Sequence, residues 1–582
     1  MKIDILNSCV PWSLGCLLLA GAASAQSPST ERVSVATSGT QGNSASYAAA
    51  ISGDGLSVAF QSSATNLVPG INSGTINVFV RNRAAGTLEC VSVSTAGAEG
   101  DSTSLSAVMS ADGNLVAYYS YATNLVAGDT NAFSDIFVRD RAAGTTERVN
   151  LPQGGGQANA DSFSPSISSA TGRFVAFSSG ALQLVSGDSN QCSDVFVRDR
   201  NTGTTTRVSL DSAGVQGNAP SFTPSISADG HFVAFESNAT NLVAGDTNAT
   251  MDIFVRDRTA PSTERVSIAT GGAQANAACD HPSISGDGRF VAFQSAATNL
   301  VPGDTNGAVD IFVRDRVNAT TERVSVSASG AQADAACNLP AFSSDGRFVA
   351  FESQATNLVA GDTNGLLDVF VRDRYGATTL RISVDSAAAQ GNGSSGGPSI
   401  SNDGRFVAFN SDATNLVAGD TNGLTDAFVR DRGVAMPVNY CTAGTSTNGC
   451  SAAIGASANP SVLLANACNL TVTNVEGQKS GILFYGINNT GYTPLPWALG
   501  STSLLCVKHP TQRTPIQNSG GTFNLCDGAY ALDWNAFQSA HPLALGNPWN
   551  VAAKVYAQAW FRDPFAVKAT NLSNAVEMTY VP

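Results

Sequence analysis

The sequence predicts an all-β protein: a seven-bladed β-propeller that is closed by an N-terminal strand and followed by a C-terminal β-sandwich. The first observation is that a phrase of the form Ser-x-Asp-Gly-Arg-Phe-Val-Ala-Phe occurs seven times, with its glycine at Gly55, Gly113, Gly172, Gly230, Gly288, Gly346 and Gly404. Successive glycines lie 58 residues apart, except for one spacing of 59. The second observation is that no helical periodicity interrupts these copies, so each repeat contains only short strands and turns.

Each copy is expected to form four short antiparallel strands, as the fifth copy illustrates. A short run at 282–285 leads into an Asp-Gly turn, and the second strand is expected at 289–293. A polar loop at 297–307 separates it from a third strand at 310–316 and a fourth at 321–326. Seven such units in a row are typical of a β-propeller.

The two ends of the array complement each other. The seventh copy stops at Arg432 without a fourth strand, whereas the segment Thr30–Val35, before the first copy, matches that missing strand. We therefore expect the N-terminal strand to complete the last blade, which would remove the exposed edges of an open array.

Composition and charge limit the classes of function. Of the 582 residues, 43% are hydrophobic, and 31 basic against 45 acidic side chains give a formal charge of −14. The first value excludes wholesale disorder, and the second argues against nucleic acid or an anionic membrane as partner. Residues 1–25 have the pattern of a secretory leader whose apolar run is too short for a membrane span, and no other candidate span is found. We expect a secreted, periplasmic or cell-surface monomer.

The repeated units Ser-x-Asp-Gly-Arg-Phe-Val-Ala-Phe and Asp-Ile-Phe-Val-Arg-Asp-Arg resemble the WD40-like repeats of the TolB-type propeller family. The resemblance covers about residues 27–432 and implies the propeller fold. It implies little about activity, because such propellers serve as binding scaffolds, lyases and peptidase gates. In TolB an α/β domain precedes the propeller, whereas here only the leader and one strand are expected before the first blade, so we do not expect a role in the Tol system.

A loop of the form Gly-Asp-x-Asn-x-x-x-Asp occurs in six copies and allows two interpretations. Clustered Asp and Asn oxygens suit calcium, although the spacing lacks the further carboxylates of an EF-hand. Alternatively, these side chains bond backbone amides within the turn. The first copy has Ile71, Ser73 and Asn77 instead. The candidate calcium ligands are Asp246, Asn248, Asp252, Asp304, Asn306, Asp310, Asp362, Asn364, Asp368, Asp420, Asn422 and Asp426.

A second candidate site lies at the first strands of copies five and six. Cys279, Asp280 and His281 stand in one copy, and Cys337 stands 58 residues after Cys279 in the next. Because first strands line the central channel of a propeller, we expect this patch near the channel mouth. Three interpretations stay open: unconnected side chains, an inter-blade disulfide, or a metal or ligand site that uses Asp280 and His281.

The Val-Arg-Asp-Arg phrase of the third strand is present in nearly identical form in all seven copies. A catalytic site is usually single, so we expect this phrase to serve inter-blade hydrogen bonds and surface charge pairs. An anion-binding array is the alternative.

Beyond the repeats, a linker is expected at 433–440 and a separate module at 441–582. Short apolar segments at 470–475, 481–486 and 551–560 alternate with turn residues and predict a β-sandwich. In an exported domain Cys441–Cys450 and Cys506–Cys526 are plausible disulfides, with Cys468 left over. The stretch resembles a C-terminal module of secreted bacterial repeat proteins. Its tryptophans are either core aromatics or a sugar-stacking platform.

No catalytic motif accompanies this architecture. The sequence has no Gly-x-Ser-x-Gly elbow, no His-Glu-x-x-His pair, and only four histidines. We therefore expect a non-catalytic binding scaffold that presents its loops and channel mouth to a protein or glycan ligand, with calcium as the one cofactor suggested. The alternative is a polysaccharide-active enzyme, a lyase or hydrolase, with its site at the channel.

Overall fold

The computed structural model describes residues 28–433 without interruption. Beyond them it describes the segments 438–440, 453–456, 468–475, 480–486, 495–496, 504–505, 511–519, 528–541, 554–562 and 570–579. The expected leader, residues 434–437 of the expected linker and both expected disulfides lie outside these residues. Among the described residues, no helix combines the length and apolarity needed to cross a membrane.

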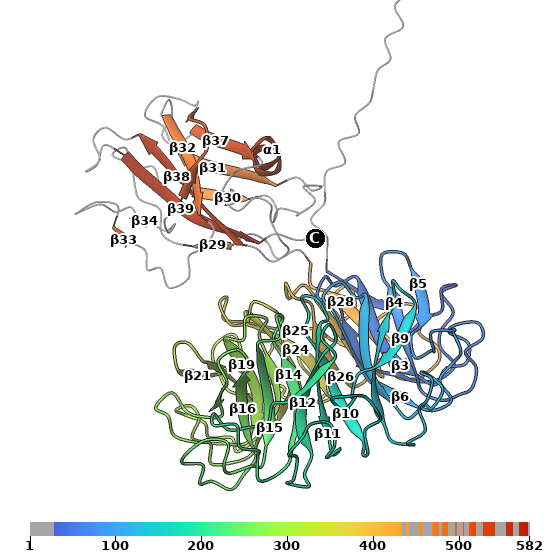
Figure 1. Cartoon of the computed structure of the whole chain (residues 1–582). Coiled ribbons are helices and arrows are strands. Elements are labelled where there is room, and N and C mark those ends of the chain that lie inside the picture. Colours follow the sequence, from blue (N-terminus) through green and yellow to red (C-terminus); the bar gives the residue numbers. More distant parts are fainter. Residues whose placement is uncertain are drawn as a thin grey trace, which may run out of the picture.

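Residues 28–433 form seven four-stranded antiparallel sheets arranged as the blades of a propeller (Figure 1). In the first six blades, four consecutive strands pair in chain order. Blades one to three contain β2 (Ser46–Ile51), β3 (Ser57–Ser62), β4 (Asn77–Asn82), β5 (Thr87–Cys90); β6 (Ser104–Met109), β7 (Leu115–Ser120), β8 (Asp135–Asp140), β9 (Thr145–Arg148); and β10 (Ser162–Ile167), β11 (Phe174–Ser179), β12 (Asp194–Asp199), β13 (Thr204–Arg207). Blades four to six contain β14 (Ser221–Ile226), β15 (Phe232–Ser237), β16 (Asp252–Asp257), β17 (Ser262–Arg265); β18 (Cys279–Ile284), β19 (Phe290–Ser295), β20 (Asp310–Asp315), β21 (Thr320–Arg323); and β22 (Cys337–Phe342), β23 (Phe348–Ser353), β24 (Asp368–Asp373), β25 (Thr378–Arg381).

The seventh blade joins the two ends of the array, as predicted. It contains β26 (Ser395–Ile400), β27 (Phe406–Ser411), β28 (Asp426–Asp431) and the N-terminal strand β1 (Ser29–Arg32). β1 pairs antiparallel with β28, with Ser29 opposite Asp431. The buried hydroxyl of Thr30 donates to the carbonyl oxygen of Val384 at 2.5 Å and accepts from Arg430 Nη1 at 3.0 Å. In Figure 1, β28 accordingly lies beside the blue strands of the first blade.

A ring of main-chain hydrogen bonds ties the seven blades together at one face of the propeller. This hairpin face holds the turns between first and second strands, at residues 52–56 and their equivalents. Each turn donates a backbone N–H to the turn of the next blade over 2.8–3.1 Å, and the bond from Asn402 to Gly53 closes the ring. The opposite face, the loop face, holds the loops between second and third strands and the connections between blades.

At five of the seven junctions, neighbouring blades interlock through one glycine and one aromatic ring. Gly288, in the hairpin of the fifth blade, has φ of +72°, and a Cβ placed there would lie 2.2 Å from Cδ2 of Phe232 in the fourth blade. Arg316 of the fifth blade covers the same ring, with its guanidinium carbon 4.4 Å from the centroid. The Nε of Arg316 also lies 2.7 Å from Oε1 of Glu264 in the fourth blade. The glycine is therefore required both for its left-handed backbone and for the space that it leaves.

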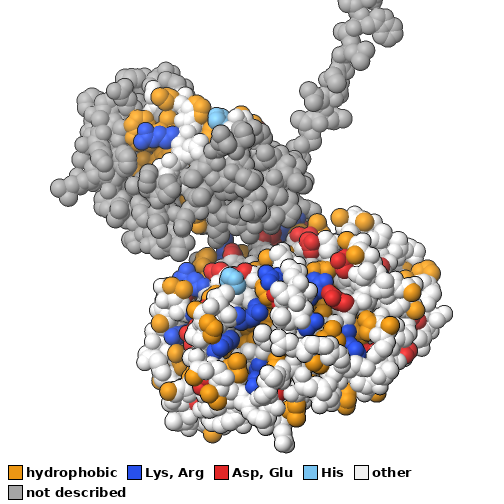
Figure 2. All heavy atoms as spheres, in the orientation of Figure 1, with side chains coloured by type: hydrophobic (Ala, Val, Ile, Leu, Met, Phe, Trp, Pro, Cys, Tyr) orange, Lys and Arg blue, Asp and Glu red, His pale blue; other side chains and the backbone are white. Residues whose placement is uncertain are grey.

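The repeated arginines serve structural contacts of the kind predicted. The hairpin arginine Arg289 makes a bidentate ion pair with Asp315 of its own blade, at 3.0 and 2.7 Å. The first arginine of the third-strand phrase bridges blades: Arg256 Nη1 donates to the carbonyl oxygen of Asp211 at 2.8 Å and to Thr263 Oγ1 at 3.0 Å. Basic and acidic side chains are scattered among uncharged ones on the visible face of the propeller (Figure 2).

The C-terminal part contains two main sheets that share a core, as expected for a sandwich. One sheet contains β29 (Val438–Tyr440), β39 (Thr570–Thr579), β38 (Lys554–Arg562), β32 (Ser480–Gly486) and β35 (Thr511–Arg513), with β36 (Gln517–Asn518) also paired to β32. The other contains β30 (Ala453–Ala456), β31 (Asn469–Val475) and β37 (Gly528–Asp533), and β33 (Leu495–Pro496) pairs with β34 (Leu504–Leu505). Leu470 and Val472 of the second sheet pack with Tyr485 and Val555 of the first.

One element of this part, a short helix, was not predicted. α1 (Trp534–Ala540) begins after Asp533, whose side chain accepts from the backbone N–H of Ala536 at 2.9 Å. It places Trp534 in the core shared by the two sheets, with its ring centroid 4.8 Å from that of Tyr485. Trp534 is therefore a core aromatic. Trp497 and Trp549 lie outside the described residues.

The interlocking of blades predicts different costs for two glycine substitutions with similar backbones. Gly288 and Gly303 have φ of +72° and +75°, but a Cβ at Gly303 would meet nothing within 4 Å. Gly303→Ala should cost about 1–2 kcal/mol for the left-handed backbone alone. Gly288→Ala should cost a further ~1–3 kcal/mol, because the added methyl group collides with Phe232. Thermal unfolding measures both, and equal midpoints would contradict the steric role of the aromatic ring.

Closure by β1 predicts that deleting residues 29–36 opens the ring. The truncated protein should melt well below the intact one, because β28 loses its neighbour and Arg32 no longer faces Asp426. Ser38→Ala, in the exposed turn that follows, serves as the control and should melt like the intact protein. A truncated protein with an unchanged melting temperature would show that β1 is dispensable.

Candidate functional site

The six Asp/Asn loops hold pairs of carboxylates against one arginine of the fourth strand. In the fourth blade, Arg265 Nη1 lies 3.1 Å from Asp246 Oδ1 and 3.3 Å from Asp252 Oδ2, and Asn248 Nδ2 donates to Asp252 at 3.1 Å. The other candidate ligands occupy the same arrangement around Arg323 (Asp304, Asn306, Asp310), Arg381 (Asp362, Asn364, Asp368) and Arg32 (Asp420, Asn422, Asp426). The cation that these carboxylates contact is therefore a guanidinium.

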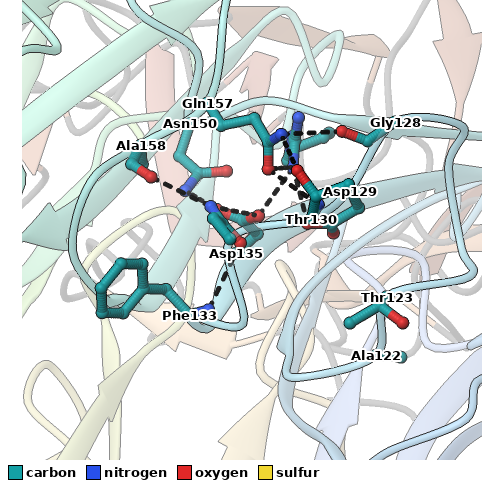
Figure 3. A network of polar contacts seen from close by, with 12 residues as sticks. Ala122, Thr123, Gly128, Asp129, Thr130, Phe133, Asp135, Asn150, Gln157 and Ala158 are labelled. Atoms are coloured by element: carbon teal, nitrogen blue, oxygen red, sulfur yellow. Dashed lines mark hydrogen bonds and ion pairs between the residues drawn. The ribbon is translucent and has the colours of Figure 1, made fainter.

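Figure 3 shows the corresponding network in the second blade. Asp129 and Asp135 lie 3.0 and 2.9 Å from Arg148 Nη1. Gln157, from the connection to the next blade, donates to the carbonyl oxygen of Gly128 at 2.8 Å and accepts from the N–H of Thr130 at 3.0 Å. These contacts match the structural interpretation of the loop, in which side chains satisfy the backbone of the turn.

Electrostatics in these loops are dominated by two buried carboxylates that share one positive charge. Burial, followed by the charge of Asp252, raises the pKa of Asp246, and Arg265 only partly offsets both effects. The same causes raise the pKa of Asp304 beside Asp310. Among the described residues, no group of three or more His, Cys, Asp or Glu side chains is arranged to hold a metal ion.

The first blade shows how the members of this network depend on each other. Ile71 and Asn77 stand where the other blades have aspartates, and Cys90 stands where they have the arginine. Glu99 replaces the glutamine of the connection and accepts from Asn77 Nδ2 at 2.8 Å and from the hydroxyl of Ser73. Both aspartates and the arginine are thus absent together, as expected if they neutralise each other.

The structure separates the four residues of the second candidate site. Cys279 and Cys337 are fully buried free thiols, so the inter-blade disulfide is not formed. They occupy the position at which other inner strands have a serine, and lie 3.3 Å from Ser295 Oγ and Ser353 Oγ respectively. Burial raises the pKa of both thiols to about 12. The cysteines therefore belong to the blade core, whereas Asp280 and His281 are partly exposed.

Every inner strand contains a β-bulge at its loop-face end, and His281 is the bulged residue of the fifth blade. Its φ is +51°, and its backbone N–H donates to Glu236 Oε2 of the preceding blade at 2.9 Å. The equivalent residues Ser106, Leu339 and Gly397 donate to Gln61, Gln294 and Glu352 over 2.8–3.1 Å. We define the channel mouth as the second and third residues of the inner strands, the second-strand residues opposite them, and Tyr121, whose ring contacts that of Tyr119.

One half of the mouth, in blades four to six, is acidic. Asp280 Oδ1 lies 3.3 Å from His281 Nδ1, and Thr223 Oγ1 donates to Glu236 Oε1 at 2.8 Å. A hydrogen bond with Asp280 raises the pKa of His281; burial opposes this shift, and the charges of Asp280, Glu236 and Glu352 add to it. A positive charge is thus stabilised at this position.

The other half of the mouth is aromatic. The ring centroid of Tyr119 in the second blade lies 5.6 Å from that of Phe163 in the third, with the ring planes at 86°. It also lies 6.3 Å from that of Tyr121, at 79°. Tyr47, Tyr121 and Phe163 are 45%, 39% and 36% exposed. Sequence reasoning singled out Asp280 and His281 but missed these aromatics and Glu236 and Glu352.

Comparisons with known proteins report similarity of low degree. No family model matches the chain, and no curated protein matches its sequence. TolB from Acinetobacter baumannii is 16% identical with a TM-score of 0.31, and covers 53% of this chain and 59% of its own. A GH74 xyloglucanase from Xanthomonas campestris is 10% identical with a TM-score of 0.37, and covers 77% and 60%. An acylaminoacyl peptidase is 10% identical with a TM-score of 0.41, and covers 75% and 59%.

This chain therefore spans about three fifths of the length of each of those structures. At these sequence identities and TM-scores, the similarity assigns no activity to the chain. The assignment of the propeller rests on the sheet topology described above.

The carboxylate pair of the fourth blade predicts that Arg265 stabilises the fold by balancing the charges of Asp246 and Asp252. Arg265→Met should destabilise the protein by about 3 kcal/mol, because two buried carboxylates then face each other without a cation. The pKa of Asp246, which is already raised, would rise further, so folding would favour its protonated form. The deficit should therefore be largest at neutral pH and shrink as the pH falls through the raised pKa.

The double variant Arg265→Met/Asp246→Asn, which moves toward the charge balance of the first blade, should recover much of the lost stability. Thermal unfolding at pH 7 and at pH 4 measures all three proteins. A calcium-dependent rise in the melting temperature of the intact protein that EDTA removes would instead assign the carboxylates to calcium.

Proposed function

We propose that this chain is an exported, non-catalytic binding scaffold that presents its channel mouth to a protein or glycan ligand. Export rests on the leader-like pattern of residues 1–25. The binding role rests on one observation: the blades are nearly identical where they hold each other together and differ where they meet the channel mouth. The following contacts support this assignment.

The hairpins of the seven blades carry the same chemistry, whereas the mouth does not. All seven hairpins have a glycine with φ between +60° and +77°. The bulge, in contrast, holds a different residue in nearly every blade: Ala48, Ser106, Ser164, Thr223, His281, Leu339 and Gly397. The second residues of the inner strands vary as well: Tyr47, Leu105, Phe163, Phe222, Asp280, Asn338 and Gly396. Variation among copies thus includes the positions around the channel axis, most of which are partly exposed.

The position of the mouth also suits a binding role. The propeller begins and ends at the hairpin face, because Ser29 of β1 lies opposite Asp431 at the end of β28. The inner strands run from the mouth toward that face, since Ser46 pairs with Ser62 and the hairpin follows Ile51. The ends of the array therefore leave the loop face, with the mouth at its centre, available to a ligand.

Binding without turnover is the test of this proposal. The full-length protein is offered a glycan array and fractionated culture-medium proteins, and retained molecules are weighed by mass spectrometry. We expect at least one ligand to be retained unchanged by the intact protein. The double variant Tyr121→Ser/Phe163→Ser, at the mouth, should bind that ligand with an affinity at least tenfold lower.

The matched control is Val317→Ser/Tyr375→Ser, which removes two exposed apolar side chains from turns of the hairpin face, where they are 73% and 58% exposed. It should retain the ligand. A saccharide recovered shortened or unsaturated would replace the proposal with the polysaccharide-active enzyme. A ligand lost equally by both variants would place binding outside the mouth.

A further inference from the structure

The channel mouth has two chemically distinct halves, and their juxtaposition indicates what class of ligand fits. In blades one to four the second residue of the inner strand is apolar or aromatic (Tyr47, Leu105, Phe163, Phe222). In blades five to seven the same position holds Asp280, Asn338 and Gly396. The ring changes character beside Phe222, which lies directly opposite the carboxylate-bearing Glu236 in the fourth blade.

Two carboxylates of the acidic half, Glu236, which is 7% exposed, and Glu352, accept hydrogen bonds from their own or the next blade. Glu236 accepts the N–H of His281 and the hydroxyl of Thr223, at 2.9 and 2.8 Å. Glu352 accepts the N–H of Gly397 at 2.9 Å with Oε2. These bonds fix the side chains at the mouth without neutralising them, because amide and hydroxyl donors carry no net charge. Histidine is the one cationic side chain among the mouth positions, and its pKa is raised there.

The aromatic half is exposed but offers no flat platform. The planes of Tyr119 and Phe163 stand at 86°, and those of Tyr119 and Tyr121 at 79°. A single ammonium or guanidinium group fits against the face of one ring within about 6 Å of its centroid. The exposed faces of these rings can therefore receive a compact cation.

We propose that the channel mouth binds a lysine or arginine side chain presented by a partner protein, with its charge toward Glu236, Asp280 and Glu352 and its aliphatic stem along Tyr119 and Phe163. The inference rests on the proposed function and names the ligand chemistry of the same site. Charge complementarity selects the cation, and the aromatic rings select a long apolar stem.

The test uses the full-length protein and an acetylated, amidated hexalysine peptide as probe, with hexaglutamate and chitosan oligosaccharide for comparison. Titration calorimetry measures binding at low and at physiological salt. We expect hexalysine to bind, and Glu236→Gln/Glu352→Gln to weaken that binding at least tenfold. Glutamine keeps an acceptor oxygen for the N–H groups of His281 and Gly397, so the fold is retained, which the melting temperature verifies.

The formal charge of −14 attracts any polycation, so a matched control is essential. Glu147→Gln/Glu264→Gln removes the same charge from the outermost strands of two blades. There the glutamate side chains are about half exposed and pair with Arg200 and Arg316. This control should leave hexalysine binding within a factor of about two. Phe163→Leu should weaken binding while leaving the salt dependence unchanged, because it removes an aromatic face and no charge.

Equal losses in both glutamate pairs would reduce the binding to general charge attraction and overturn the inference. Binding of chitosan without hexalysine would overturn the protein partner in favour of a cationic glycan. If the mouth variant loses the ligand of the proposed function while no variant binds hexalysine, the scaffold role stands and the inference of a cationic ligand falls.

Discussion

Five of the seven blade junctions depend on one contact, the packing of an aromatic ring of one blade against a left-handed glycine in the hairpin of the next. Phe174, Phe232, Phe290, Phe348 and Phe406 each lie within 2.4 Å of where a Cβ would stand on the following hairpin glycine. An arginine of the following blade covers each of these rings within about 4.5 Å. Because ring, glycine and arginine come from two blades, a change in any of them disturbs two units. This mutual dependence explains why the repeat is so uniform in sequence.

The uniformity of the repeat also bears on how the formal charge of −14 is distributed. Six arginines of fourth strands each contact two aspartates, so two of the carboxylates counted in the formal charge share one positive charge within each of these loops. The first blade, which lacks the arginine and both aspartates together, keeps its loop through the hydrogen bonds of Glu99. At the mouth, Glu236 and Glu352 instead accept hydrogen bonds from uncharged backbone donors.

The sequence predicted the features that recur in every repeat, but it did not predict the contacts between residues of different strands or blades. The period of 58 residues and the match of Thr30–Val35 to the missing strand predicted the closed propeller. The ion pairs of the Asp/Asn loops could not be predicted, because a loop read alone shows Asp246 and Asp252 but not Arg265, which stands 13 residues after Asp252 on another strand. The mouth combines residues 45 positions apart, such as Glu236 and His281, an offset that a 58-residue repeat does not display. The helix α1 was missed because seven residues are too few for a periodic pattern.

The conformational cost of the bulges is a further reason to assign a role to their side chains. A non-glycine residue with left-handed φ costs about 1 kcal/mol or more relative to glycine. In the hairpins, where only packing is required, all seven blades use glycine. In the bulges, six of the seven blades keep a side chain at φ between +47° and +52°, and only Gly397 avoids the cost. Stability alone would favour glycine at all seven bulges. The side chains at these bulges, His281 among them, therefore carry a conformational cost that glycine would avoid.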